Sequence, residues 1–389
     1  MPLFRRSAAS STAAAAGAHP TVRDDTQREA LSAQQILPAL TSIRFLFALG
    51  VVLFHLELIW AFPTREYTAL IERSRLGVEM FFMLSGFVLS LVYTRQFEER
   101  RYSHRRFLVA RLARIYPAHI AILGMMGAVA VAALAFGQGF NQANYSLAGF
   151  IRTALLVQSW GPSPGQVEWN GPSWSLSAEW FAYLLFPPFA LVGLKLRRRP
   201  IVLLALSIAI FAAMDVAYRS AFGETVLHAQ ENLGVMRIVP TFLAGIGLHA
   251  LSLKMTFSRP VAIAAAATSI AMLLGLMHAG VAEPLIVVAG AVMIFCLAML
   301  SRAGADGPLA HPAALFLGEA SYAIYLTHLP LITIWRNAHA LRMDGDSRYL
   351  LAGWEVAALL ALSIVGGSII HAIWERPARV WIRKRLLSS

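Results

Sequence analysis

Long apolar stretches alternate along the chain with short clusters of charged residues. An apolar stretch of about 18 residues or more is long enough to cross a bilayer as a helix. The pattern predicts about ten spans: 42–62, 76–94, 113–136, 173–194, 200–220, 234–253, 260–279, 281–301, 313–336 and 350–373. The boundary between the seventh and eighth spans is the least marked, because Glu283-Pro284 is its only turn signal. We therefore expect an all-α, polytopic membrane bundle.

Composition supports this expectation. Of the 389 residues, 58% are hydrophobic and 14% are charged, whereas a soluble domain carries about 25% charged residues. Residues 1–35 differ, because they are rich in Ala and Ser and contain no apolar block. We expect them to form a disordered cytoplasmic tail before a membrane domain at 36–389. The single cysteine, Cys296, excludes a disulfide or a cysteine-based metal site within one chain.

The basic residues give the bundle a direction. The chain carries 33 Lys and Arg against 21 Asp and Glu, a formal net charge of +12. Such a balance suits either nucleic acid or the anionic cytoplasmic leaflet. Clusters of Lys and Arg lie before the first predicted span and after the second, fourth, sixth and tenth, and the other loops are poor in Lys and Arg or balance them with acids. These are alternate loops, so the positive-inside rule favours membrane lipid over nucleic acid and places both termini in the cytoplasm.

Two cations occupy one face of the first predicted span. Eleven residues separate Arg44 from His55, which is about three helical turns and ~16 Å of rise. With Arg44 at the cytoplasmic edge, His55 is expected near the middle of the membrane. An ionisable group at that depth is costly and indicates a functional site. The alternative is an arginine that reaches the interface and a histidine that is only structural.

A second pair of cations follows the second span. Arg111 and Arg114 are three residues apart and therefore neighbours on one helix face. The planar guanidinium group matches phosphate oxygens, so this pair suits an anionic ligand at the membrane surface. Anchoring of the helix at the cytoplasmic interface explains the same spacing.

Five polar residues inside apolar stretches are further candidates. They are Glu79 and Ser85 in the second span, Glu179 in the fourth, and Tyr325 and His328 in the ninth. A carboxylate at such a position orients a histidine or an acceptor hydroxyl, or satisfies a hydrogen bond between helices. Ser85 also lets helices approach closely. His328 is one turn from Tyr325 on the same face and suits a structural or a catalytic role.

The longest outer connection, 137–172, contains Pro, Gly and several Trp residues, and Trp174 follows it directly. A loop of this length is often functional, and its tryptophans suit the faces of sugar rings. By contrast, the sequence contains no metal-binding motif, no Walker loop and no dinucleotide fingerprint. We therefore expect no metal ion and no use of ATP.

Five motifs together resemble the membrane-bound acyltransferase-3 family over about residues 36–385. They are Arg44 and His55, Phe81 to Phe87, Arg111 and Arg114 followed by Tyr116-Pro117, Ser173 to Glu179, and Ser321 to His328. The resemblance implies transfer of an acyl group, acetyl by default, from acyl-CoA to hydroxyls of extracytoplasmic acceptors. It also implies a multi-pass protein of the bacterial cytoplasmic membrane. The implied acceptor is a cell-surface glycan or a lipid-linked sugar, and a small hydrophobic product such as a macrolide is the alternative.

The resemblance also implies roles for the candidate residues. Arg111 and Arg114, together with Arg44, hold the phosphates of acyl-CoA. His55 is then the general base or the carrier of the acyl group. Glu179 or Glu79 orients the histidine or the acceptor, and Ser85, Trp174, Tyr325 and His328 support the site. A transporter, or a scaffold without enzymatic activity, is the rival class, since intramembrane charges also mark transport paths. The acceptor, the acyl chain and the oligomeric state are left open.

Overall fold

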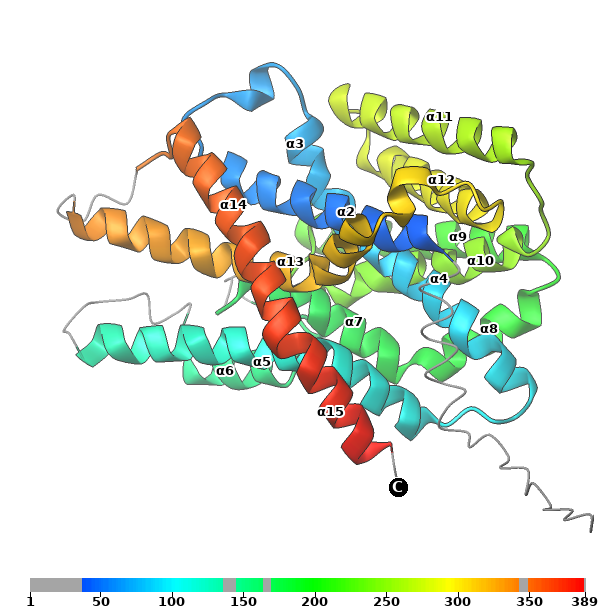
Figure 1. The fold of residues 1–389 in the computed structure, drawn as a ribbon, viewed down its shortest axis with the longest axis horizontal. Helices are drawn as coiled ribbons and strands as arrows, with labels where there is room; N and C mark the ends of the chain where they lie inside the picture. The colour runs from blue at the N-terminus through cyan, green and yellow to red at the C-terminus, as the bar shows by residue number, and fades with distance from the viewer. Residues whose placement is uncertain (1–36, 136–144, 164–168, 343–348, 388–389) are drawn as a thin grey trace, which may run out of the picture.

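The computed structural model describes residues 37–135, 145–163, 169–342 and 349–387 (Figure 1). The tail expected at 1–35 lies outside the described residues. The helices are α2 (Pro38–Glu57), α3 (Leu70–Arg73), α4 (Gly77–Glu98), α5 (His104–Ala135), α6 (Leu147–Ala154), α7 (Trp174–Leu184), α8 (Phe186–Leu196), α9 (Pro200–Phe222), α10 (Val235–Ser252), α11 (Arg259–His278), α12 (Glu283–Arg302), α13 (Pro312–Arg342), α14 (Gly353–Ile370) and α15 (Arg376–Leu386). Short 3₁₀ turns, η1 to η5, and a π turn, η6 (His371–Glu375), join them.

The helices confirm the predicted fold class. Within the described ranges, nine helices are long and apolar enough to cross a membrane, and a bent pair brings the number to ten. That pair, Gly171–Leu184 and Phe186–Leu196, bends by 64°. Each predicted span has a counterpart, including the two that meet at Glu283-Pro284. The protein is therefore a multi-pass membrane protein.

Three helix ends differ from the prediction. The first span ends at Glu57 rather than at 62, so His55 lies in the last turn of α2. The third begins at His104 rather than at 113, because α5 extends through the basic segment. The tenth continues through η6 into α15 as far as Leu386. Apolar windows missed the extensions of α5 and of the last span because charged residues continue these helices beyond their apolar parts, whereas α2 ends before its apolar stretch does.

Proline and glycine set many of the helix ends. Proline occupies the first or second position of α2, α8, α9, α11, α12 and α15, where its missing N–H costs no hydrogen bond. Gly223 ends α9 in the left-handed conformation, with φ 79°. Pro330 lies inside α13 and leaves the carbonyl of Leu326 without its helical donor. The side-chain amide of Asn170 donates to that carbonyl at 3.2 Å.

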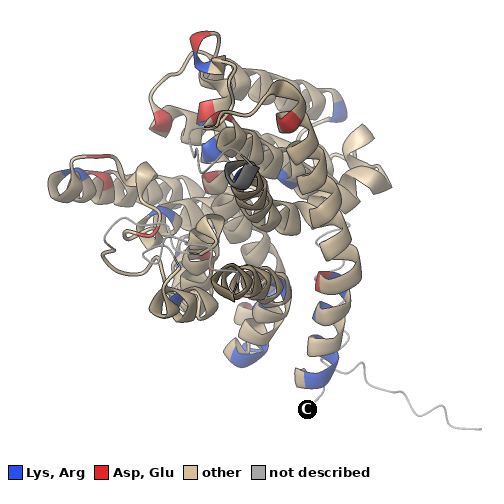
Figure 2. Cartoon of the chain, turned by 90° about the vertical axis from the view of Figure 1, so that its left-hand side faces the viewer, with Lys and Arg blue, Asp and Glu red and all other residues tan. Residues whose placement is uncertain are grey.

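Contacts between loops place alternate connections at the same end of the bundle. An Arg197–Glu98 ion pair joins the ends of α8 and α4, and Lys254 donates to the carbonyl of Arg198. We call this the basic end. At the other end, Glu283 pairs with Arg73. Figure 2 shows Lys and Arg gathered near the C-terminus of the chain, in the last helix. That the basic end faces the cytoplasm remains a prediction.

Helices α4 and α10 cross closely in the core because glycine stands at the crossing point. A Cβ on Gly86 would overlap the backbone of Phe242, and a Cβ on Gly245 would overlap the carbonyl of Met83. Two helices in a membrane associate through such close backbone packing. Sequence reasoning expected close approach beside Ser85, and Gly86 provides it.

We expect Gly245→Val to destabilise the fold. The added side chain must push α4 away from α10, at a cost of about 1–3 kcal/mol or more. Thermal unfolding of the purified protein in detergent measures the change. Gly275→Ala in α11 is the matched control, since a Cβ there meets nothing within 4 Å. Equal unfolding temperatures for the two variants would contradict this account of the crossing.

The connection before α7 folds back into the bundle, contrary to the expectation of an outer loop. From Tyr145 the chain returns along α5, where Nε2 of His119 and the carbonyl of Thr153 are 2.9 Å apart. Beyond this point Ser159 and Trp160 bond to Ser177 in α7. The chain then rises again, so that Trp169 donates to the carbonyl of Ser146. Irregular backbone is tolerated at such depth only where protein buries it.

Candidate active site

A cavity of about 330 Å³ opens among α2, α4, α5, α7, α13 and α15. Six arginines line it: Arg44 from α2, Arg111 and Arg114 from α5, and Arg376, Arg379 and Arg383 from α15. Two carboxylates, Glu179 and Glu319, also line it. The cavity therefore carries four positive charges in excess, inside a helical bundle where an uncompensated charge is costly. We call it the arginine cavity.

Three of these arginines have an Nε atom without a hydrogen-bond partner. The Nε atoms of Arg44, Arg111 and Arg383 are buried and make no hydrogen bond. A buried donor without an acceptor costs about 1–3 kcal/mol. An anion with several oxygen atoms would satisfy these donors and the excess charge together, so the cavity fits a phosphate-bearing ligand.

Glu179 forms one wall of the arginine cavity. Its Oε1 accepts hydrogen bonds from the hydroxyls of Ser85 and Tyr183, each at 2.5 Å. Both donors hold the carboxylate in place between α4 and α7. The structure thus brings the predicted residues Glu179 and Ser85 together and places them on the same cavity as Arg44.

A narrower chamber of about 40 Å³ continues from the arginine cavity into the bundle. The two spaces share Arg44, Ser85 and Glu179 in their walls. The remaining wall of the chamber is mostly apolar and aromatic: Val78, Phe81, Phe82, Ser175, Leu176, Tyr322 and Tyr325. The guanidinium of Arg44 lies 5.9 Å from the centre of the Phe81 ring, at the boundary between the two spaces. An extended chain would pass here, but a phosphate group would remain at the arginines.

His55 and His328 form a hydrogen-bonded pair beyond Tyr325. Nε2 of His328 lies 3.1 Å from Nδ1 of His55, and the ring centres are 4.8 Å apart. Nδ1 of His328 lies 2.5 Å from the carbonyl of Tyr325. Since a carbonyl only accepts, that nitrogen carries the hydrogen, and Nε2 of a neutral His328 is an acceptor.

The hydrogen bonds of His55 set its tautomer. Its Nδ1 faces two acceptors, Nε2 of His328 and the carbonyl of Val51 at 2.9 Å. Nδ1 therefore carries the hydrogen, and a neutral His55 has its lone pair on Nε2. His328 is fully buried, while His55 is half-buried. His55 is thus the more accessible member of the pair.

Tyr325 connects the histidine pair to the refolded connection. Its hydroxyl lies 3.0 Å from the hydroxyl of Ser175 and 3.0 Å from the carbonyl of Pro172. Its backbone carbonyl accepts from His328, and its side chain lines the inner chamber. Tyr325 therefore lies between the chamber and the histidines, and its supporting role stays a prediction.

Two predicted residues have other partners. Glu79 is fully buried and pairs with Arg237, whose Nε donates to Oε1 at 2.6 Å. The guanidinium of Arg237 also lies 4.5 Å from the centre of the Trp174 ring. Trp174 is only 5% exposed, so its ring has no open face for a sugar. A cation from α10, distant in sequence, occupies both side chains, and their roles as acceptor-binding or supporting residues stay predictions.

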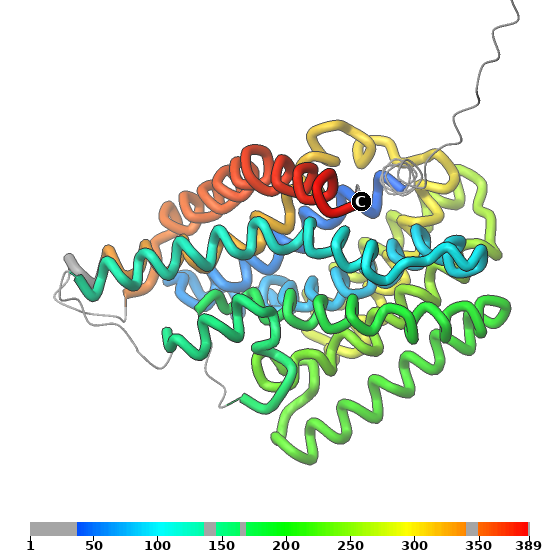
Figure 3. The backbone as a smooth tube through the Cα atoms, turned by 90° about the horizontal axis from the view of Figure 1, so that it is seen from below, coloured from blue at the N-terminus to red at the C-terminus, as the bar shows by residue number. Residues whose placement is uncertain are grey.

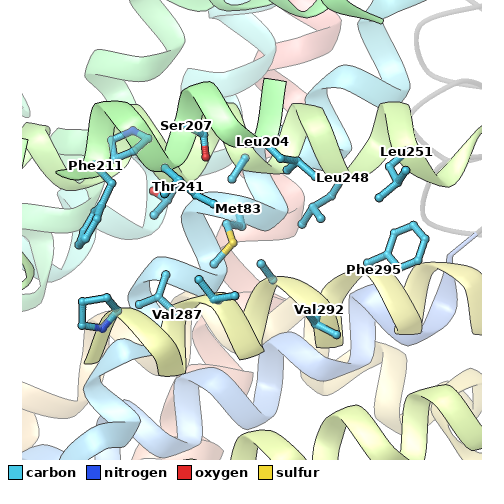
Figure 4. A pocket seen from close by; sticks show the side chains of 16 residues that line it. Met83, Leu204, Ser207, Phe211, Thr241, Leu248, Leu251, Val287, Val292 and Phe295 are labelled. Atoms are coloured by element: carbon cyan, nitrogen blue, oxygen red, sulfur yellow. The ribbon is translucent and has the colours of Figure 1, made fainter. Parts of the chain in front are cut away.

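A second cavity, of about 310 Å³, lies among α9, α10 and α12 (Figure 4). Apolar side chains such as Phe211, Leu248 and Phe295 line it, together with Met83. The hydroxyl of Thr241 in its wall donates to the carbonyl of Arg237. This cavity offers no group for catalysis. In the described ranges, no group of three or more His, Cys, Asp and Glu residues is arranged to hold a metal ion.

Comparison with known proteins identifies the family. A family model described as an acyltransferase domain matches residues 37–372. The chain belongs to the acyltransferase-3 family. It is thus a multi-pass membrane acyltransferase. No solved structure was found to match it.

Two named relatives are acyltransferases. Acyltransferase MdmB of Streptomyces mycarofaciens is 30% identical over 382 residues, which cover 90% of this chain and 93% of the relative. Peptidoglycan O-acetyltransferase OatA of Listeria monocytogenes is 24% identical over 338 residues, 77% of this chain and 50% of the relative.

Sequence reasoning missed part of the acyltransferase's arginine cavity. Arg376, Arg379 and Arg383 were interpreted only as cytoplasmic anchors after the last span. Their spacing of three and then four residues places them on one helix face, and this signal was present in the sequence. Glu319 and Tyr183 line the same cavity, but no spacing in the sequence indicates this, because single polar residues in apolar spans occur throughout the chain.

Proposed function

We propose that the protein transfers an acyl group, acetyl by preference, from cytoplasmic acyl-CoA to a hydroxyl of an extracytoplasmic glycan, across a bacterial cytoplasmic membrane. The main support is the order in which the arginine cavity, the inner chamber and the histidine pair follow one another. The arginine cavity shares Arg44, Ser85 and Glu179 with the inner chamber. Tyr325 lines that chamber, and its carbonyl bonds to His328, which lies against His55. We infer that the donor follows this series as its path.

The donor is expected to lie along this path. Its phosphates occupy the arginine cavity, where the unpartnered Nε atoms of Arg44 and Arg111 supply charge-assisted hydrogen bonds. Its pantetheine arm follows the chamber past Phe81 and Tyr322. Arg44 and His55 are ~16 Å apart along α2, a separation that the extended arm must cover for the thioester to reach His55.

His55 then acts through Nε2. As a general base, it takes the proton of the acceptor hydroxyl while the hydroxyl oxygen attacks the thioester carbon. The carbon–sulfur bond breaks, and the leaving thiolate receives the proton. As a nucleophile, the same nitrogen attacks the thioester carbon, and the carbon–sulfur bond breaks to release the thiolate. The acceptor hydroxyl then attacks the acyl carbon, the carbon–nitrogen bond breaks, and the hydroxyl proton passes to the thiolate. His328 positions the ring in both cases, since it fixes the hydrogen on Nδ1.

A glycan acceptor is supported by the printed name of the Listeria relative, which is a peptidoglycan O-acetyltransferase. The printed name of the Streptomyces relative states the activity but no acceptor. A small hydrophobic acceptor such as a macrolide is the alternative, and it requires the same donor site and the same His55.

The proposal predicts thiol release from acetyl-CoA over many turnovers by purified protein in liposomes, and such sustained release only when an acceptor is present. Solubilised cell-wall glycans and a macrolide are supplied in separate reactions. We expect release with the glycans, together with an added acetyl mass in the product by mass spectrometry.

His278→Ala is a suitable active control, because this histidine is exposed and bonds only to Thr68 in the described chain. Thiol release with the macrolide but not with the glycans would indicate a small hydrophobic acceptor instead. If no thiol is released with any combination of acceptor and acyl-CoA, the proposed donor is wrong.

A further inference from the structure

We propose that the last helix, α15, recognises the 3′-phosphate of the donor's nucleotide, so that the enzyme distinguishes CoA from its 3′-dephospho form. This inference rests on the proposed function and adds a specificity determinant to it. Three arginines of α15 carry it: Arg376, Arg379 and Arg383.

These arginines form one face of α15. Residues 376, 379 and 383 follow the three- and four-residue spacing of a helix stripe, and all three line the arginine cavity. Lys384 and Arg385 follow directly in sequence, but they lie on other faces and are exposed. The cavity side of α15 is therefore distinct from the general basic character of this terminus.

The position of α15 is fixed by specific contacts. Its preceding π turn packs against α5, where Nε1 of Trp374 donates to the carbonyl of Pro117 at 2.9 Å. Within the turn, Nδ1 of His371 lies 2.9 Å from Oε2 of Glu375, and both side chains are buried. Figures 1 and 3 show α15 alongside α5. The three arginines thus stand across the cavity from Arg111 and Arg114.

Unsatisfied donors and charge point to a second phosphate. Nε of Arg383 is buried without a hydrogen bond on the α15 side, and so is Nε of Arg111 on the α5 side. A π turn often marks a functional position in a helix. CoA carries a diphosphate and a 3′-phosphomonoester, about four negative charges at neutral pH. This number equals the positive excess of the cavity, six arginines against two carboxylates.

The two sides of the cavity then divide the phosphates between them. Arg44 lines both the arginine cavity and the inner chamber. Arg114 is near enough to Arg44 for the two charges to interact. The diphosphate, which joins the pantetheine arm, belongs on this side. The 3′-phosphate, on the ribose at the other end of the donor, meets Arg379 and Arg383.

The test compares acetyl-CoA with 3′-dephospho-acetyl-CoA as donors. We expect the unchanged enzyme to prefer acetyl-CoA by about tenfold or more in kcat/KM, the effect of one charge-assisted hydrogen bond. The double variant Arg379→Gln and Arg383→Gln should lose this preference through a higher KM for acetyl-CoA. Its turnover of the dephospho donor should be unchanged, which also shows that the variant is folded.

Two control variants make the result specific. Lys384→Gln, on another face of α15, should keep the full preference. Arg44→Gln, on the diphosphate side, should weaken both donors equally and so keep their ratio. Equal use of both donors by the unchanged enzyme, or a preference that survives in the double variant, would overturn the inference and leave the proposed function standing. A double variant that changes only the dependence on anionic lipid in the liposomes would assign these arginines to lipid headgroups instead.

Discussion

Replacing His55 by Ala should reduce acyl transfer by roughly 10²–10⁴-fold, the usual contribution of a positioned acid–base group. His55 is the more exposed member of the histidine pair, and Nε2 of its neutral ring carries a lone pair. The loss should appear in kcat, because the donor phosphates bind at the arginine cavity, outside the contacts of His55. Thiol release from acetyl-CoA in the presence of acceptor measures it.

His328→Ala separates chemistry from positioning. His328 is fully buried and acts on the substrate only through His55. Its removal should lower kcat less than His55→Ala does, and it should shift the pH profile of kcat, since Nδ1 of His55 loses an acceptor. His278→Ala should behave as the unchanged enzyme. Full activity of the His55→Ala protein would exclude both proposed roles of this residue.

The double variant Arg111→Ala and Arg114→Ala should raise the KM for acyl-CoA by about 100-fold. Each charge-assisted hydrogen bond to a phosphate contributes about 1.5–3 kcal/mol, and each 1.4 kcal/mol is a factor of ten. Initial rates at varied donor concentration give the value. The KM for the acceptor should stay constant, because both residues line the cavity at the basic end.

The matched control for this pair is Arg105→Ala and Arg106→Ala. These residues lie on the same helix, are exposed and do not line the arginine cavity. They should change membrane anchoring at most. If only the acceptor KM rises in the Arg111/Arg114 variant, the donor has been assigned to the wrong cavity.

Some kinds of site residue can be predicted from the sequence, and others cannot. The sequence predicts five residues that line one cavity: Arg44, Ser85, Arg111, Arg114 and Glu179. They can be predicted because each is a charged or polar residue inside, or next to, an apolar stretch. Glu79 satisfied the same criterion and instead pairs with Arg237. A carboxylate that neutralises a buried arginine and one that faces a ligand look alike in sequence.

The helical spans, the alternate basic loops and the shared face of Arg44 and His55 can be predicted from the amino-acid order alone. These features depend on apolar length and on the periodicity of a single helix, which are local properties. The packing of the helices was needed to show that His328 bonds to His55, that Asn170 donates to the carbonyl left free by Pro330, and that α15 packs against α5. Those contacts depend on how helices cross and rotate against one another, at points such as Gly86 and Gly245. The crossings join residues far apart in the chain, and no local pattern records them.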